Sequence, residues 1–216
     1  DWLAANGMAW LDALRAMFIL YGALGLAIFF LYRRLPPPPP HRQAPSPTPL
    51  GPSRGIVFRL AALFSLDAFA GGLLVNTLLA LWLFERFGLS LAAAGSFFFW
   101  AGLLTAVSQL AAPRVARRIG LLNTMVFTHI PSNLCLIGAA FASTLPLALA
   151  LLFLRSALSQ MDVPTRSAFV MAVVTPAERP AAASFTAVPR SLAAALSPAL
   201  GGAMFAAGFT AMPLAL

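Results

Sequence analysis

Long apolar runs alternate with short polar connections along most of the chain. Six runs are long enough to cross a bilayer as a helix, which takes about 20 residues. They lack the alternating pattern of barrel strands, and backbone groups in lipid must pair within their own segment. The pattern predicts an all-α, polytopic membrane helical bundle, with residues 210–216 beginning a seventh run. The six predicted spans are residues 8–32, 60–84, 89–112, 119–141, 145–174 and 181–209.

The composition also indicates a membrane protein. Hydrophobic residues make up 60% of the chain and charged residues 9%, whereas soluble domains carry about 25% charged residues. The net charge of +8 comes from arginines spread between the apolar runs, which favours the lipid bilayer as partner and argues against nucleic acid. Cys135 is the single cysteine, so neither a disulfide nor a cysteine-based metal site is expected. We expect no cofactor and no metal.

One stretch breaks the apolar pattern, "RRLPPPPPHRQAPSPTPLGPSR". Its prolines exclude a helix and favour an extended, polyproline-type segment. The sequence therefore divides into a transmembrane helix at residues 1–32, a Pro- and Arg-rich linker at residues 33–55, and a helical transmembrane domain at residues 56–216. The linker is either a basic tether or a docking site for a proline-binding module, and the tether is the simpler interpretation.

Arginine is unevenly divided between alternate connections. One set carries nine arginines and the other carries one, Arg86. By the positive-inside rule the arginine-rich set, which includes the linker, is cytoplasmic. The chain then starts outside, which requires a signal peptide or an odd number of preceding spans, so we expect a piece of a longer membrane protein. The nine arginines are Arg33, Arg34, Arg42, Arg54, Arg59, Arg114, Arg117, Arg118 and Arg179.

Charged residues interrupt the fifth run, in "LFLRSALSQMDVPTRSAF". Arg155, Ser159, Asp162 and Arg166 are spaced 4, 3 and 4 apart and would share one face of a helix. Each charge costs about 2.5–3.5 kcal/mol at a bilayer centre, so these side chains should face a bundle interior or a wet cavity. Asp162 and Arg166 can neutralise each other, with interfacial anchoring as the alternative for Arg166. Arg155 has no local acid, so it either lines a cavity or pairs with another helix.

The second run contains one acid, Asp67, followed by two glycines. A carboxylate in such a place either carries a proton during a transport cycle or forms a fixed ion pair, for which Arg155 and Arg190 are candidates. Gly71 and Gly72 should allow a neighbouring helix to approach closely.

Uncharged polar side chains and small residues complete the candidate set. The polar residues either form interhelical hydrogen bonds or bind substrate inside a cavity. They are Asn76, Gln109, His129, Asn133 and Gln160.

The sixth run, "VPRSLAAALSPALGGAMF", combines prolines with glycines, which indicates tight packing or a hinge in a moving helix. Pro189, Pro198, Gly201 and Gly202 carry this pattern, and Pro164 is expected to bend the fifth run.

Four short motifs, "ARRIG", "LFLRSALSQ", "TPAER" and "SPALGG", resemble the C-terminal half of a major facilitator superfamily transporter. "ARRIG" is similar to the family's cytoplasmic loop signature G-x-x-x-D-R-x-G-R-R through Arg118 and Gly120, and departs from it at Arg117 and at the leucines that follow. "LFLRSALSQ" places Arg155 where the family has a buried arginine, and "SPALGG" resembles the proline motif of antiporters. "TPAER" is similar to a helix-ending loop. The apolar runs would then be helices six to eleven and the start of twelve.

This resemblance implies secondary active transport by rocking of two halves around a midplane site. The partners would be a missing N-terminal half, a small-molecule substrate and protons, in a bacterial inner membrane. The residues that the resemblance implies for substrate binding or proton coupling are Asp67, Arg155, Asp162 and Arg166. Efflux is favoured over uptake through the proline motif.

Two other function classes compete with transport. A membrane enzyme is not expected, because the chain has no H-E-x-x-H, no G-x-S-x-G and only two histidines, His41 and His129. A receptor or scaffold would use the Pro-rich linker as its functional part.

Overall fold

The computed structural model describes residues 7–36 and 48–208. Two predictions lie wholly or partly outside these ranges: residues 37–47 of the Pro-rich linker and the start of the seventh run. The chain divides into two compact units, residues 1–44 and residues 45–216. Each unit is described by itself.

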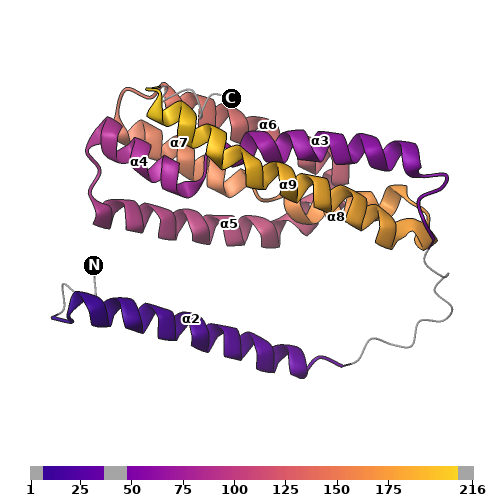
Figure 1. Cartoon of the computed structure of the whole chain (residues 1–216), viewed down its shortest axis with the longest axis horizontal. Coiled ribbons are helices and arrows are strands. Elements are labelled where there is room, and N and C mark those ends of the chain that lie inside the picture. Colours follow the sequence, from indigo (N-terminus) through magenta and orange to yellow (C-terminus); the bar gives the residue numbers. More distant parts are fainter. Residues whose placement is uncertain (1–6, 37–47, 209–216) are drawn as a thin grey trace. The chain divides into compact units, whose positions relative to one another are not determined.

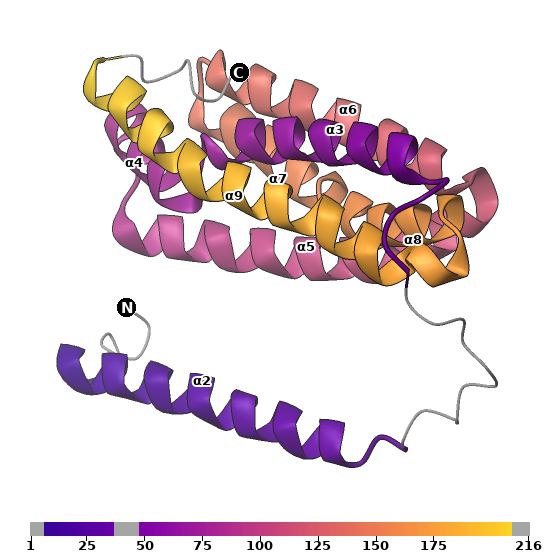
Figure 2. The same cartoon turned by 45° about the vertical axis from the view of Figure 1, so that its right-hand side comes forward.

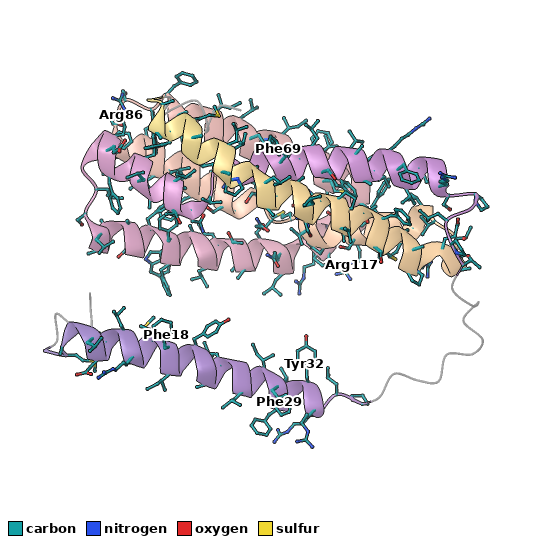
Figure 3. All side chains as sticks on the ribbon, in the orientation of Figure 1. Phe18, Phe29, Tyr32, Phe69, Arg86 and Arg117 are labelled. Carbon is teal, nitrogen blue, oxygen red and sulfur yellow. The ribbon has the colours of Figure 1, made fainter. Side chains whose placement is uncertain are left out.

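The first unit contains one long helix, α2 (Trp10–Arg33), which matches the predicted span at residues 8–32. Its apolar side chains are exposed all round: Phe18 is 75% exposed and Tyr21 79%. Figure 3 shows Phe18, Phe29 and Tyr32 projecting from this helix. A helix that is apolar on every side is typical of a membrane span.

The second unit is an up-and-down bundle (Figures 1 and 2). The most extensive contact between helices is that of α3 with α9. Helices α5 and α6 both pack against α7 and α8. The connections that carry Arg117, Arg118 and Arg179 lie at the end of the bundle where α3 begins (Figure 2). Its elements are α3 (Arg54–Gly72), α4 (Asn76–Phe87), α5 (Leu91–Ile119), α6 (Leu121–Ala140), α7 (Leu145–Leu158), α8 (Asp162–Val173), the 3₁₀ turn η1 (Pro176–Glu178) and α9 (Arg179–Ala206).

Four segments of the described residues are long and apolar enough to cross a membrane: Leu11–Arg33, Arg54–Phe87, Leu91–Ile119 and Leu145–Val173. They correspond to four of the six predicted spans. The remaining two form α6 and α9, which are helices of 20 and 28 residues. Both pack into the bundle.

Two of the spans are interrupted in the middle. The segment from α3 to α4 breaks at residues 73–75, directly after the two glycines, which the sequence pattern did not predict. The segment from α7 to α8 breaks at residues 159–161, so the bend expected at Pro164 occurs just before it. Pro164 lies in the first turn of α8, where its missing N–H leaves no intrahelical bond unmade.

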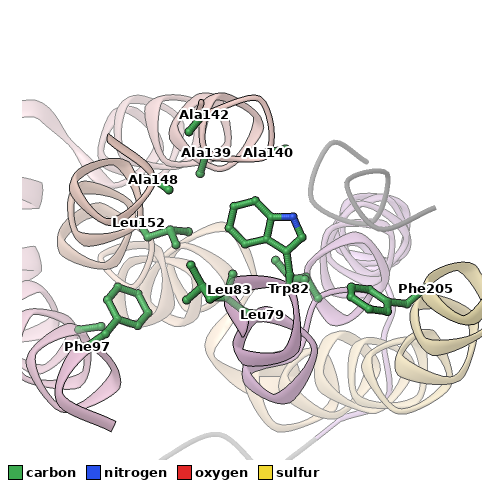
Figure 4. Close-up of a cluster of buried hydrophobic side chains, with 12 residues drawn as sticks. Leu79, Trp82, Leu83, Phe97, Ala139, Ala140, Ala142, Ala148, Leu152 and Phe205 are labelled. Atoms are coloured by element: carbon green, nitrogen blue, oxygen red, sulfur yellow. The ribbon is translucent and has the colours of Figure 1, made fainter. Parts of the chain in front are cut away.

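Two clusters of buried apolar side chains hold the second unit together. The larger one joins α4 to α5, α6, α7 and the end of α9, and includes Leu83, Leu152 and Phe205 (Figure 4). The smaller one joins the start of α3 to the end of α8 and the start of α9, and includes Val57 and Val170. Dispersion contacts between packed side chains therefore hold both ends of the bundle together.

The ionisable residues of the spans occupy the level between these clusters. Asp67 on α3, His129 on α6, Arg155 and Arg166 on the α7–α8 segment, and Arg190 on α9 each lie between residues of the smaller and the larger cluster along the chain. The middle of the bundle is therefore polar where both ends are apolar.

Helices α3 and α9 cross in close contact because of two glycines. A Cβ at Gly201 would lie 2.0 Å from the carbonyl oxygen of Leu73, and a Cβ at Gly72 would lie 2.0 Å from Oγ of Ser197. Gly71 and Gly202 have open space at the same position. Close approach therefore depends on one glycine of each pair, while α9 continues as a single helix through Pro198.

The turn between α5 and α6 is a single residue, Gly120, with φ of +89° and ψ of 159°. This backbone conformation is strained for any residue with a Cβ. Arg117 and Arg118 are exposed in the last turn of α5, where positive charge interacts favourably with the helix C-terminus.

Candidate functional site

A cavity of about 470 Å³ opens at the polar middle level of the bundle. Its wall is built by α3, α6, α9 and both sides of the α7–α8 break. Small residues at the end of α3, including Gly71 and Gly72, leave the space into which long side chains from the other helices extend. The ionisable residues of the wall are Asp67, His129, Arg155, Asp162, Arg166 and Arg190.

Four of these residues form one connected group, which we call the ionic network: Asp67, His129, Asp162 and Arg166. Nε2 of His129 lies 2.7 Å from Oδ1 of Asp67, and Nη2 of Arg166 donates to Oδ2 of Asp67 at 2.8 Å. Arg166 also bonds Asp162, one helical turn away. The network therefore ties α3, α6 and α8 together.

Arg166 is the centre of the ionic network. Its side chain is 12% exposed, is bonded to two carboxylates, and lies over the ring of Phe64 at 4.9 Å from the ring centroid. The alternative that Arg166 anchors the helix at the membrane interface is therefore wrong, because both acids hold it inside the bundle. Asp67 is paired with Arg166 and His129 instead of Arg155 or Arg190, which were the candidate partners if Asp67 formed a fixed ion pair.

The ionic network has one negative charge more than it has positive charges, so one added proton would neutralise it. Two ionised carboxylates and one guanidinium sum to a charge of −1 when His129 is neutral. Nε2 of His129 faces Asp67, while Nδ1 is buried without a hydrogen-bond partner and lies 3.8 Å from Oδ2 of Asp162. A proton on Nδ1 would face the second carboxylate and bring the network to neutrality, which is favourable in a medium of low dielectric constant.

Arg155 and Arg190 have no such partners among the described residues. No carboxylate lies within 4.0 Å of either guanidinium in this part of the chain, and Nε of each is buried without a hydrogen bond. Arg155 belongs to the last turn of α7, whose free carbonyl groups favour a positive charge.

A family model described as Major Facilitator Superfamily matches residues 2–159 of the chain. This match covers well over half of the sequence. The chain belongs to the Major Facilitator Superfamily. No curated protein and no solved structure matches it. The predicted all-α membrane bundle and the predicted family are both confirmed, and membrane transport is the general function of this family; its members are typically not enzymes.

The residues that line the cavity of this superfamily member lie partly inside and partly outside the matched range. Asp67, His129 and Arg155 lie inside the matched residues, whereas Asp162 and Arg166 lie beyond residue 159. The network thus joins residues from both sides of the boundary.

The uncharged polar candidates are split between the cavity and the outer surface. Asn133 and Gln160 line the cavity, as does Ser159 at the α7–α8 break. Asn76, at the start of α4, and Gln109, on α5, are exposed and lie outside it. The helix rotation that buries the apolar faces turns these two outward, so the structure does not support a place for them in the cavity.

One cavity residue was considered only as an ion-pair partner from the sequence. Arg190 lies well inside the predicted span at residues 181–209, and this depth is the signal that could have identified it as a wall residue.

A second polar group, the Glu178 cluster, lies outside the spans at the α8–α9 connection. Oε1 of Glu178 accepts from the backbone N–H of Gly51 at 2.5 Å, and Oε2 accepts from Oγ of Ser53 and Oγ1 of Thr175, each at 2.6 Å. The sequence marked "TPAER" only as a loop. These bonds, first among them that of Ser53, lower the pKa of Glu178 to about 2 from an ordinary 4.5.

The Glu178 cluster predicts a pH-dependent stability. Because the pKa is lower in the folded state, the stabilisation by Glu178 is fully present above about pH 4.5 and is lost as the pH falls through 2. At neutral pH, Glu178→Gln is expected to lower the unfolding temperature in detergent, and the difference from wild type should shrink as the solution is acidified. Glu85→Gln, which changes an exposed acid with no hydrogen bond, is the control. A difference that stays constant with pH would contradict this role.

Proposed function

We propose that the chain serves proton-coupled secondary transport of a small molecule by alternating access. The observation that carries this proposal is the ionic network at the cavity wall, which links three helices through ion pairs that one proton can rearrange. Intramembrane acids and histidines of this kind are typical of proton pathways. Cavities at the middle level of a bundle, beside broken helices, are typical of transporter binding sites.

The coupling step depends on competition for Arg166. With His129 neutral, Arg166 holds both Asp67 and Asp162, and α3 is tied to α8. A proton that reaches Asp67 removes the negative charge that attracts Arg166 and leaves Arg166 to Asp162. The link between α3 and α8 is then released, and the two broken spans supply the places where the helices can bend.

The rest of the proposal concerns the whole transporter. The chain would be its C-terminal half, with a separate N-terminal half completing the cavity, and Pro198 would act as a hinge in α9. We place the linker in the cytoplasm and the chain in a bacterial inner membrane. The positive-inside rule supports the cytoplasmic side, because Arg117, Arg118 and Arg179 lie at the end of the second unit where α3 begins. Efflux is the proposed direction.

The test is proton movement in proteoliposomes that contain the protein carrying this sequence and an entrapped pH-sensitive dye. Organic anions, cations and neutral solutes are supplied in turn, and at least one is expected to move protons with it. Asp67→Asn should reduce that rate about tenfold or more, the scale of a coupling free energy of about 1–3 kcal/mol. Asp12→Asn, an exposed acid on α2, is the matched control. Equal rates in wild type and Asp67→Asn would remove the proton role.

A further inference from the structure

Two positive charges in the cavity wall are left without a counter-charge. The guanidinium groups of Arg155 and Arg190 have no acid within 4.0 Å among the described residues, while the nearby acids are already engaged. Nε of each arginine is buried and makes no hydrogen bond. The positive charge of these two arginines is therefore additional to the ionic network.

Such a pair of charges is costly at the middle of a membrane bundle. An arginine there is costly unless it is paired or hydrated. The C-terminal carbonyl groups of α7 offset part of this cost for Arg155, but Arg190 lies inside the continuous helix α9 and has no helix end beside it. The wall near these residues also contains neutral hydrogen-bonding groups, those of Asn133, Ser159 and Gln160.

We infer that Arg155 and Arg190 form an anion site, which takes a carboxylate or a phosphate group. Guanidinium groups bind planar carboxylates and phosphates through paired N–H bonds, and a buried anion would neutralise charges that no described residue neutralises. If the bound molecule is the transported one, a point that rests on the function proposed above, the substrate is an organic anion. A free anion and an anionic lipid headgroup share this chemistry.

Binding can be measured on the purified chain in phosphatidylcholine nanodiscs by calorimetric titration with benzoate, inorganic phosphate and neutral benzamide. Benzoate or phosphate should bind, and benzamide should not. Arg155→Gln and Arg190→Gln should each weaken anion binding about tenfold or more, because each removes charge-assisted bonds. Arg155→Lys should restore part of the affinity. Arg59→Gln makes the same charge change at an exposed residue outside the cavity and should leave binding unchanged.

A second arm separates free anions from lipid headgroups. In phosphatidylglycerol nanodiscs, a headgroup occupant would abolish benzoate and phosphate binding, and native mass spectrometry would show retained phosphatidylglycerol that Arg155→Gln and Arg190→Gln release. Either source supports the anion site. The inference is overturned if neither soluble anion nor phosphatidylglycerol binds, if the glutamine variants bind as tightly as wild type, or if benzamide binds as well as benzoate. Should a glutamine variant fail to fold, the comparison of benzoate with benzamide on wild type decides.

The flux assay distinguishes this inference from the proposed function. Anion binding without any proton-coupled flux would leave the site in place and remove the transport mechanism. Flux of a neutral or cationic solute that is unaffected by Arg155→Gln and Arg190→Gln, together with no anion binding in the titrations, would leave transport in place and remove the site.

Discussion

Replacing Arg166 by glutamine is expected to lower the free energy of unfolding by about 3–5 kcal/mol, the usual effect of removing one partner from a buried ion pair. The change leaves the carboxylates of Asp162 and Asp67 without their shared cation. The loss affects Asp162 more than Asp67. The side chain of Asp162 is only 6% accessible, so its carboxylate cannot regain contact with water unless α8 moves. Reversible unfolding in mixed micelles is the measurement.

A double-mutant cycle shows whether the loss comes from the uncompensated charge. Asp162→Asn in the Arg166→Gln background should recover part of the lost stability, because it removes one of the two unpaired carboxylates. Arg59→Gln is the control for the charge change alone, since Arg59 is exposed. Two results would show that the ionic network is not a stabilising unit. One is that Arg166→Gln is as stable as Arg59→Gln. The other is that Asp162→Asn destabilises the Arg166→Gln protein as much as it destabilises the wild type.

Alanine at Gly201 is expected to destabilise the bundle by about 1–3 kcal/mol or more, the range measured for overpacked cores. The new Cβ would lie 2.0 Å from the carbonyl oxygen of Leu73, which is backbone and can move only if α3 and α9 separate. At Gly202, one residue further along α9, the Cβ meets nothing within 4 Å, so alanine there should change stability by no more than about 1 kcal/mol.

Gly72 offers a sharper version of the same experiment. Alanine at Gly72 collides chiefly with Oγ of Ser197, a small side chain, so its effect should be smaller than that of Gly201→Ala. Ser197→Ala should rescue Gly72→Ala but leave Gly201→Ala unimproved, because the obstacle at Gly201 is Leu73. Thermal unfolding of the variants in one detergent gives the order. Equal effects at Gly201 and Gly202 would show that α3 and α9 are not in close contact.

The helices of this protein follow from local physics. A backbone surrounded by lipid must satisfy its hydrogen bonds within the segment, so an apolar run of sufficient length predicts a helix without knowledge of its neighbours. The same reasoning places Arg155, Asp162 and Arg166 toward a polar interior, because lipid exposure of a charge is costly wherever the helix lies. All three line the cavity, although the helix that carries them is broken between Leu158 and Asp162.

Pairings between helices did not follow from local physics. Asp67 had several arginines within plausible reach, and the rotation of α3 against α6 and α8 selected Arg166 and His129. The same rotations turned Asn76 and Gln109 outward, since a polar side chain in a sequence carries no sign of which neighbour it will meet. The Glu178 cluster joins residues 127 positions apart in the chain, a separation at which sequence pattern contains no signal.

The sequence by itself determined the helical spans and the inward orientation of the costly charges, because each depends on the energy of a segment in lipid. It also determined the family resemblance, which depends on short motifs. The tertiary structure decided the break after Gly72, the partners of Asp67 and the unpaired state of Arg155 and Arg190 in the described chain. These features depend on how helices rotate and pack. Alternative ion pairs differ in free energy by only a few kcal/mol, so the contacts of the whole bundle together decide which pair forms.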